Sequence, residues 1–190
     1  MKHNAGFSLV ELMIAMVIGL IIMLGAGQLF LTVFQTNRQV ETLGEKQAAV
    51  NFAVETLLRD IRRADWDSDD TAWDEDAAVL SLDVKNQGDV SSGCDPGENV
   101  VKNYKLSSSG VFSVEMDKCD GVDLGGGYQE LVSGFLAPDE VTPGPGFEVD
   151  DNEWNNGLLE VIFRLVPTDE DATPDTLVFH AVNRTTAVNK

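Results

Sequence analysis

Residues 12–37, LMIAMVIGLIIMLGAGQLFLTVFQTN, contain no charged side chain between Glu11 and Arg38. At a rise of 1.5 Å per residue, a helix of this length would extend about 39 Å, enough to cross the apolar core of a bilayer with some tilt. A cleaved secretory signal has an apolar core of only about 7–15 residues, followed by a small-residue cleavage site. This run is longer and no such site follows it. We therefore predict a transmembrane helix that stays in the mature protein.

One carboxylate lies at the start of the apolar stretch. An ionised Glu11 would be costly there unless it stayed near the lipid headgroups or met a cationic partner. Its surroundings are Gly6-Phe7-Ser8-Leu9-Val10-Glu11-Leu12-Met13-Ile14. This segment resembles the class III signal of type IV pilins and pseudopilins: a short basic leader ends in Gly, an aromatic residue follows, and a Glu precedes an unbroken apolar helix.

The resemblance implies processing between Gly6 and Phe7 by a prepilin peptidase, which would also N-methylate Phe7. It implies that Glu11 neutralises the amino group of Phe7 on a neighbouring subunit, which would supply the missing cation. The other implied partners are major and minor pilins, the inner-membrane assembly platform and membrane lipid. The basic leader favours a cytoplasmic N-terminus. The resemblance implies a chain in the inner membrane, with a periplasmic head that later reaches the pilus filament or its tip.

An amphipathic continuation of the helix is predicted over residues 38–64. Apolar side chains recur there at spacings of three and four residues, with one polar member; the stripe consists of Val40, Leu43, Gln47, Val50, Val54, Leu57, Ile61 and Ala64. The other face is charged, with Arg38, Glu41, Glu45, Lys46, Glu55, Arg59 and Arg62. Such a stripe is typical of packing against a sheet, and a free coiled coil is the alternative.

The sequence of the helix narrows the resemblance to PilW-like minor pilins. It rests on residues 8–30, on Asn51-Phe52-Ala53 and on residues 57–64. Two features depart from the family. No proline interrupts the membrane half of the helix, and Asp65-Trp66-Asp67-Ser68 keeps only the aromatic residue of the glycine- and cysteine-containing pattern that follows in PilW-like chains.

Charge divides the chain near residue 65. Residues 1–64 carry six basic and five acidic side chains, whereas residues 65–190 carry seven and twenty-seven, and the whole chain has a net charge of −19. This excess of acid argues against direct nucleic-acid binding, which needs a basic face. We predict four parts: a leader (1–6), a transmembrane helix (7–37), its amphipathic continuation (38–64) and an acidic β-rich exported head (65–190).

Short apolar runs bounded by turn residues predict an antiparallel sheet in the head. The predicted strands are 79–84, 100–106, 111–115, 131–136, 158–166 and 177–182, with 107–110 as a hairpin turn. Residues 138–157 contain three prolines and the polar run 150–153, and are expected to form an exposed loop. Because strands follow the helix without alternation, we predict an α+β fold in which the long N-terminal helix packs on the sheet.

Cys94 and Cys119 are the only cysteines, and they flank the predicted hairpin. If the head is exported, a disulfide between them is favoured over two free thiols. Closing a loop of this size would stabilise the head by about 3 kcal/mol. We therefore predict a Cys94–Cys119 disulfide.

Four acidic residues have the spacing of a calcium loop. Asp65, Asp67, Asp69 and Asp76 occupy positions 1, 3, 5 and 12 of the stretch, but Asp70 stands where an EF-hand requires Gly, and position 12 is not Glu. In so acidic a head, such spacings arise by chance. We expect a solvated acidic surface without a cofactor, with calcium as the alternative.

Nothing in the sequence points to catalysis. There is no nucleophile elbow, P-loop, HExxH or dinucleotide fingerprint, and His180, in a predicted strand, is the only histidine after Gly6. We expect a non-enzymatic minor pilin of a type IV pilus; by resemblance, the system serves twitching motility, adhesion or DNA uptake. The alternatives are a minor pseudopilin of a type II secretion system and a membrane-anchored calcium- or glycan-binding ectodomain.

Overall fold

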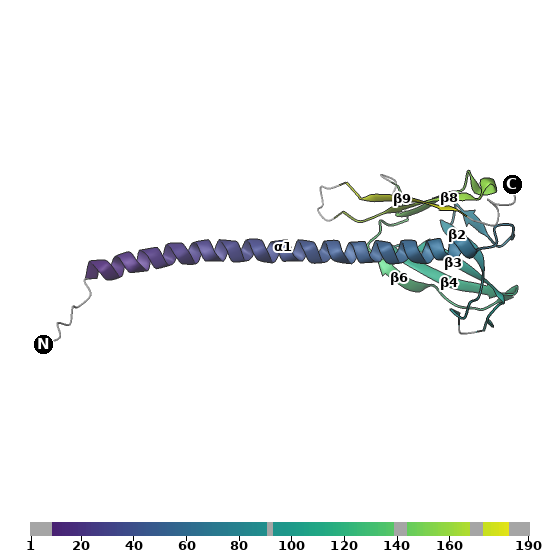
Figure 1. Ribbon diagram of the computed structural model, residues 1–190, viewed down its shortest axis with the longest axis horizontal. Coiled ribbons are helices and arrows are strands. Elements are labelled where there is room, and N and C mark those ends of the chain that lie inside the picture. The colour runs from purple at the N-terminus through teal and green to yellow at the C-terminus, as the bar shows by residue number, and fades with distance from the viewer. Residues whose placement is uncertain (1–8, 91–92, 139–143, 168–172, 183–190) are drawn as a thin grey trace. The chain divides into compact units, whose positions relative to one another are not determined.

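The computed structural model describes residues 9–90, 93–138, 144–167 and 173–182. It divides the chain into two units, Met1–Glu45 and Lys46–Lys190. One unbroken helix, α1 (Leu9–Arg63), contributes to both units, and all strands lie in the second (Figure 1). The expected α+β fold, with one long N-terminal helix and an antiparallel head, is confirmed.

The head contains two antiparallel sheets. The larger has the order β1-β2-β3-β4-β5, with β6 also paired to β4, and the smaller has the order β7-β8-β9. The first sheet comprises β1 (Ala72–Asp74), β2 (Val79–Lys85), β3 (Asn99–Leu106), β4 (Val111–Cys119), β5 (Val122–Asp123) and β6 (Gln129–Ser133). The second comprises β7 (Phe147–Asp150), β8 (Leu158–Arg164) and β9 (Thr176–Val182), with the 3-10 helix η1 (Trp154–Asn156) before β8.

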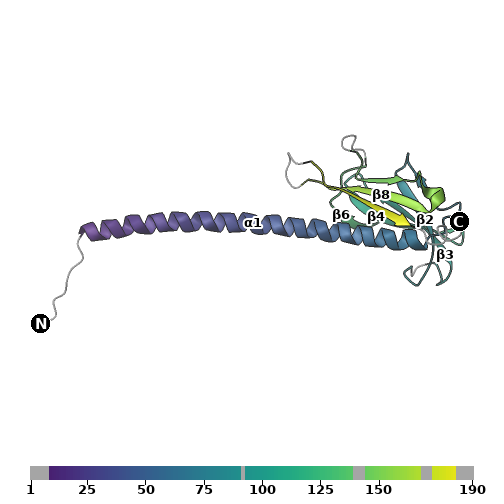
Figure 2. The ribbon, with the colours of Figure 1, turned by 45° about the horizontal axis from the view of Figure 1, so that its top comes forward.

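Aromatic rings join the two sheets into one core. Figure 2 shows the strands of both sheets in the head. The ring of Phe112 on β4 lies 5.4 Å from that of Phe147 and 5.3 Å from that of Phe163, and all three side chains are buried. Edge-to-face contacts of this kind add to the gain from burying the rings. The backbone also connects the sheets, because Leu136 donates to the carbonyl of Arg164 at 2.9 Å.

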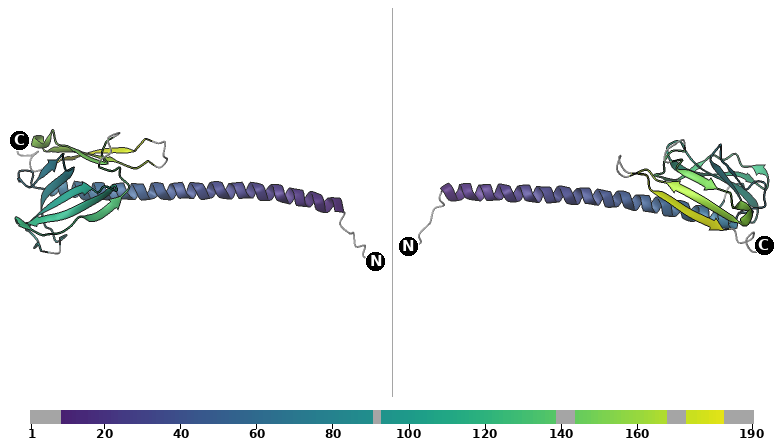
Figure 3. Two further views of the ribbon diagram at one scale, coloured as in Figure 1. Left: turned by 180° about the vertical axis from the view of Figure 1, so that it is seen from behind. Right: turned by 90° about the horizontal axis from the view of Figure 1, so that it is seen from above.

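The last turns of α1 pack against the head, as Figure 3 shows from two sides. Ala53, Leu57 and Ile61 are fully buried there, since their spacing of four residues places them on one face of the helix. The helix end is fixed by a backbone bridge between Ala64 and Val84. The predicted packing on a sheet is thus confirmed for the stripe members Leu57, Ile61 and Ala64, whereas the upstream members Val40 and Leu43 are exposed.

The expected exposed loop at 138–157 is wrong for residues 147–150. Residues 147–150 form β7, and Phe147 and Val149 are buried. Phe147-Glu148-Val149-Asp150 alternates apolar and polar side chains, the period of a half-buried strand, but the run is short and lies between prolines and a polar stretch. Residues 139–143 of the expected loop lie outside the described residues.

The shortest strands also escaped prediction. β1 and β5 have three and two residues, too few for any periodicity, and they exist because they pair with the edges of longer strands. The predicted strand 131–136 begins two residues earlier, at Gln129, and ends at Ser133 as β6. The hairpin formed by β3 and β4 is present as predicted, with Leu106 opposite Phe112.

Candidate functional site

The N-terminal motif falls partly outside the described residues. Gly6 and Phe7 lie before the first of them, and Glu11 lies in the first turn of α1 with its side chain exposed. The positive end of the helix macrodipole favours a carboxylate in this turn. One turn further along the helix, Ile14 and Ala15 provide no positive charge.

The helix that follows Glu11 is apolar around its whole circumference. α1 is long and apolar enough to cross a membrane by length and composition. Its first unit exposes large apolar side chains in every turn, among them Leu12, Met13, Ile14, Val17, Ile18, Ile21, Ile22, Leu29 and Phe30. A helix that is hydrophobic on all sides is stable only when lipid or other apolar helices surround it.

A buried charge network joins α1 to the first sheet, and the sequence analysis missed it. Asp60 of α1 is 0% exposed and lies 3.0 Å from Nζ of Lys102 on β3 and 2.9 Å from Nη2 of Arg63. The hydroxyl of Tyr104 donates to the same carboxylate at 2.5 Å. Asp89 completes the network, with contacts of 2.8 Å to Lys102 and 2.6 Å to Arg63.

The network shifts the titration of its members. Burial alone would raise the pKa of Asp89, but hydrogen bonds from Lys102 and Arg63 hold it well below the usual range. Burial, with the neighbouring Asp60 carboxylate, raises the pKa of Tyr104 well above 10.0. Two carboxylates therefore face two cations and a neutral phenol. Such a network fixes one register of the helix on the sheet, because removing either partner leaves a buried charge uncompensated.

The sequence did contain a signal for this network. Asp60 lies three residues after Leu57 and four before Ala64, which places it on the buried face of α1. Val100, Lys102 and Tyr104 occupy every second position of β3, and all three are buried on its inner face. A charge at an apolar position of a helix and another in a strand indicate a buried pair.

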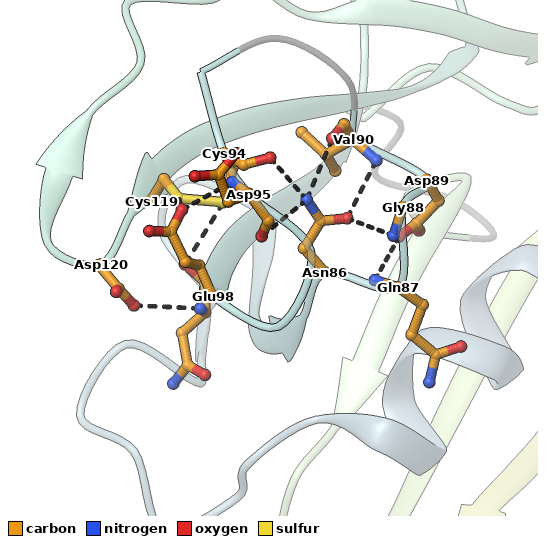
Figure 4. Close-up of a disulfide and its surroundings, with 11 residues drawn as sticks. Asn86, Gln87, Gly88, Asp89, Val90, Cys94, Asp95, Glu98, Cys119 and Asp120 are labelled. Carbon is orange, nitrogen blue, oxygen red and sulfur yellow. Dashed lines mark hydrogen bonds between the residues drawn. A yellow bond between two sulfur atoms is a disulfide. The ribbon is translucent and has the colours of Figure 1, made fainter.

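The expected disulfide is present between Cys94 and Cys119, with an S–S distance of 2.03 Å (Figure 4). It ties the loop after β2 to the end of β4. The amide of Asn86 organises that loop: Nδ2 donates to the carbonyls of Val90 at 3.0 Å and Cys94 at 2.9 Å, while Oδ1 accepts the backbone N–H of Gly88 at 2.9 Å. The covalent and polar contacts together define the fold of a segment with little regular structure.

The four aspartates with calcium-loop spacing are all exposed. Asp65, Asp67 and Asp69 lie between α1 and β1, and Asp76 lies in the turn between β1 and β2. Within the described part of the chain, one group of three potential metal-binding side chains has its ligand atoms within 4.8 Å of one another: Cys94, Glu98 and Cys119. Both of those cysteines are in the disulfide, so neither offers a thiolate.

His180 lies on β9 beside Glu160 of β8. Its Nε2 is 2.9 Å from the Glu160 carboxylate, and both side chains are at least one-third exposed. The two residues are direct cross-strand partners in the second sheet. This arrangement is that of a surface cross-strand pair.

The comparisons with known proteins concern the N-terminal segment. The family model of the prokaryotic N-terminal methylation motif matches residues 1–27, which include Gly6, Phe7 and Glu11. No curated protein and no solved structure matches the chain. The motif is followed by a long apolar helix and an antiparallel head. Together these features support a protein of the type IV pilin-like or pseudopilin class, which prepilin peptidase processes.

Proposed function

We propose that the chain is a minor pilin of a type IV pilus, of the PilW-like kind, and not an enzyme. The observation that carries the proposal is the methylation motif at residues 1–27, continued by an uncharged helical surface to Asn37. In this role a prepilin peptidase cuts between Gly6 and Phe7 and methylates the new N-terminus. The resemblance of residues 57–64 to PilW-like chains favours the pilus over the pseudopilus.

Glu11 is the assembly residue of this proposal. In the inner membrane its carboxylate lies close to the cytoplasmic headgroups, because it occupies the first turn of α1. In a filament the apolar helices pack against one another, and Glu11 pairs with the amino group of Phe7 of a neighbouring subunit. A buried pair of this kind is weak as a source of stability but strong as a determinant of register.

The remaining assignments follow from this role. The chain crosses the inner membrane once, with the leader in the cytoplasm and the head in the periplasm, and then enters the filament or its tip. Its partners are prepilin peptidase, the major and minor pilins and the assembly platform. Twitching motility, adhesion and DNA uptake belong to the whole system, and the acidic head takes part in uptake only through partners.

The first test is the N-terminus of the mature protein. Intact mass and N-terminal sequencing should show the loss of Met1–Gly6 and an N-methylated Phe7. The Gly6→Leu variant should stay uncleaved, whereas the control Gly19→Ala, with open space around its Cβ, should be processed normally. An intact leader on the wild-type protein would instead indicate a membrane-anchored ectodomain.

A second test separates the pilus from the type II secretion system. Deletion of this gene should reduce surface pili and leave protein secretion unchanged. The protein itself should appear in the sheared filament fraction. Loss of secretion with normal piliation would reject the minor-pilin proposal in favour of a pseudopilin.

A further inference from the structure

The last turns of α1 carry a groove beside the face that packs on the head. Its volume is about 890 Å³, and it lies between the helix and the loop after β2, where Gln87 contributes to its lining (Figure 4). The helix side includes Asn51, Val54, Leu58, Arg59 and Arg62. Their spacing of three to four residues places most of them on one face of α1. We call this surface the arginine groove.

The arginine groove is positive on a strongly acidic protein. Three cations of the head each pair with a carboxylate: Lys102, Lys118 and Arg164. Arg62, by contrast, is exposed and forms no ion pair with any described residue. The Arg59 side chain is 58% exposed, and its Nε lies 3.3 Å from Asp60. Two guanidiniums therefore face solvent in a chain of net charge −19.

Apolar and polar side chains complete the groove. Val54 and Leu58 are half-buried and offer apolar surface on the helix side. Arg59 and Arg62 follow within one turn, and planar guanidiniums bind carboxylates through two parallel hydrogen bonds. The amide of Gln87 can donate to and accept from a peptide backbone. The negative end of the helix macrodipole also favours arginines here, but it does not account for the apolar surface beside them.

We propose that the arginine groove binds an extended acidic peptide segment of a partner protein. From Asn51 to Arg62 the helix rises about 16 Å, which is the length of about five residues of extended chain. Two carboxylates of the segment pair with Arg59 and Arg62, and one apolar side chain packs on Leu58. Charge complementarity identifies this occupant, because the rest of the head repels anions that extend beyond the groove.

The same charges disfavour two other occupants. A nucleic acid needs several phosphate contacts, and its backbone would continue over the acidic surface of the head. A second copy of this chain would bring a head of the same sign, so its approach is opposed beyond the groove itself. A short acidic segment of a different protein meets the positive surface without this repulsion.

Two features of the groove limit the expected affinity. Glu55 also lines it and repels a carboxylate, while Arg63 is already bound to Asp60 and Asp89. Exposed ion pairs are individually weak, so we expect a Kd of about 10⁻⁴ to 10⁻³ M for an isolated peptide. Such an affinity is sufficient between subunits held side by side in a filament, where effective concentrations are in the mM range. Only this consequence depends on the proposed pilin role.

The test is calorimetric titration of two pentapeptides, Leu-Ser-Glu-Ser-Glu and its reverse, into the full chain in detergent. Side chains alternate along an extended chain, so the leucine and both glutamates lie on one side. At least one peptide should bind in the stated range, and more weakly as NaCl rises from about 0.05 to 0.5 M. Analogues with Gln in place of Glu should not bind.

Two results would overturn the proposal. One is the absence of binding by either peptide up to about 10 mM, well above the expected Kd. The other is tighter binding of a short oligothymidylate than of either peptide, which would assign the groove to nucleic acid. Because the peptides bind in solution, neither result depends on leader processing or on Glu11.

Single substitutions locate the binding surface. Arg62→Gln should weaken peptide binding about threefold, and the double variant with Arg59→Gln about tenfold, as expected for exposed ion pairs. Glu55→Gln should strengthen binding, because it removes a repulsion. Lys85→Gln is the matched control, since it removes one exposed cation outside the groove and should bind normally. Normal binding by Arg62→Gln, or an equal loss in Lys85→Gln, would contradict the assignment.

Discussion

At the scale of single residues, two carboxylates show two ways to keep a negative charge among apolar groups. Asp60 is compensated within the chain by Lys102 and Arg63. Glu11 has no charged neighbour on the described part of its own helix, and its partner in our proposal is another subunit. The source of the compensating charge therefore distinguishes fold stability from assembly.

The Glu11→Val variant separates insertion from assembly. Removing the carboxylate makes the helix more apolar, so the protein should still insert and be processed normally. Filament entry should fall at least about tenfold, which needs a loss of only about 1.4 kcal/mol of subunit interaction. Quantification of the variant in membrane and sheared-filament fractions measures both effects. The control Glu41→Val changes an exposed position beyond the apolar run, and its incorporation into filaments should be unchanged. Efficient filament entry of Glu11→Val would refute the assembly role of Glu11.

Removal of Asp60 should destabilise the head strongly. Asp60→Ala leaves Lys102 buried with one fewer carboxylate and removes the acceptor of the Tyr104 hydroxyl. The expected loss is about 3–5 kcal/mol in the free energy of unfolding, measured by urea denaturation. The double variant Asp60→Leu with Lys102→Met should recover part of that loss, because no buried charge of the pair remains. Additive losses in the double variant would show that the two residues do not interact.

Asp89 should make the head sensitive to acid. Its pKa is lower in the folded than in the unfolded chain, so its contribution to stability is complete above the unfolded value and declines as the pH falls toward the folded value. The free energy of unfolding should therefore decrease as the pH drops below about 4. Asp89→Asn should be less stable at neutral pH and should show a flatter acid dependence. An unchanged slope of stability against pH in this variant would exclude the contribution.

At the scale of elements, the sequence was informative where a pattern was long. The uncharged run and the stripe predicted α1, and short apolar runs bounded by turn residues predicted β2, β3, β4, β8 and β9. β7 was missed because only four residues carry its pattern, between proline-rich and polar segments. The calcium-loop spacing follows neighbouring positions along the chain, whereas the buried charge network brings together Asp60 of α1, Lys102 of β3 and Asp89 of the loop after β2. Such a group depends on register, which local patterns do not determine.

The turn between β3 and β4 has a specific requirement for glycine. Gly110 has a φ of +70°, and a Cβ added there would lie 2.1 Å from the carbonyl oxygen of Phe135. Gly110→Ala should therefore lower the free energy of unfolding by more than the backbone strain alone, which is about 1 kcal/mol. Gly97→Ala is the matched control, since Gly97 also has positive φ but open space around its Cβ. Equal losses for the two variants in urea denaturation would rule out the steric contribution.

At the scale of the whole molecule, charge limits how the subunit is used. If processing removes Lys2, the mature chain has twelve basic and thirty-two acidic residues, a net charge of −20, nearly all of it in the head. Neighbouring copies would repel one another. At 0.1 M salt this repulsion is largely screened only between charges more than about 10 Å apart. A sparse or tip-located subunit avoids this repulsion, because its neighbours are other pilins. The acidic composition thus favours a minor over a major subunit.

Because of this charge, we predict that copies of the chain associate only at high salt. In detergent, the full protein should remain monomeric at about 10 mM salt, where the screening length is near 30 Å, and associate more readily at about 1 M. Sedimentation velocity measures this dependence. A variant that neutralises the exposed residues Asp150, Asp151 and Glu153 should show a weaker dependence on salt. Quantitative mass spectrometry of sheared filaments should find far fewer copies of this chain than of the major pilin. Stoichiometric incorporation, or self-association that does not change with salt, would contradict a sparse location. A dense array of such heads would need a compensating charge that this chain does not carry.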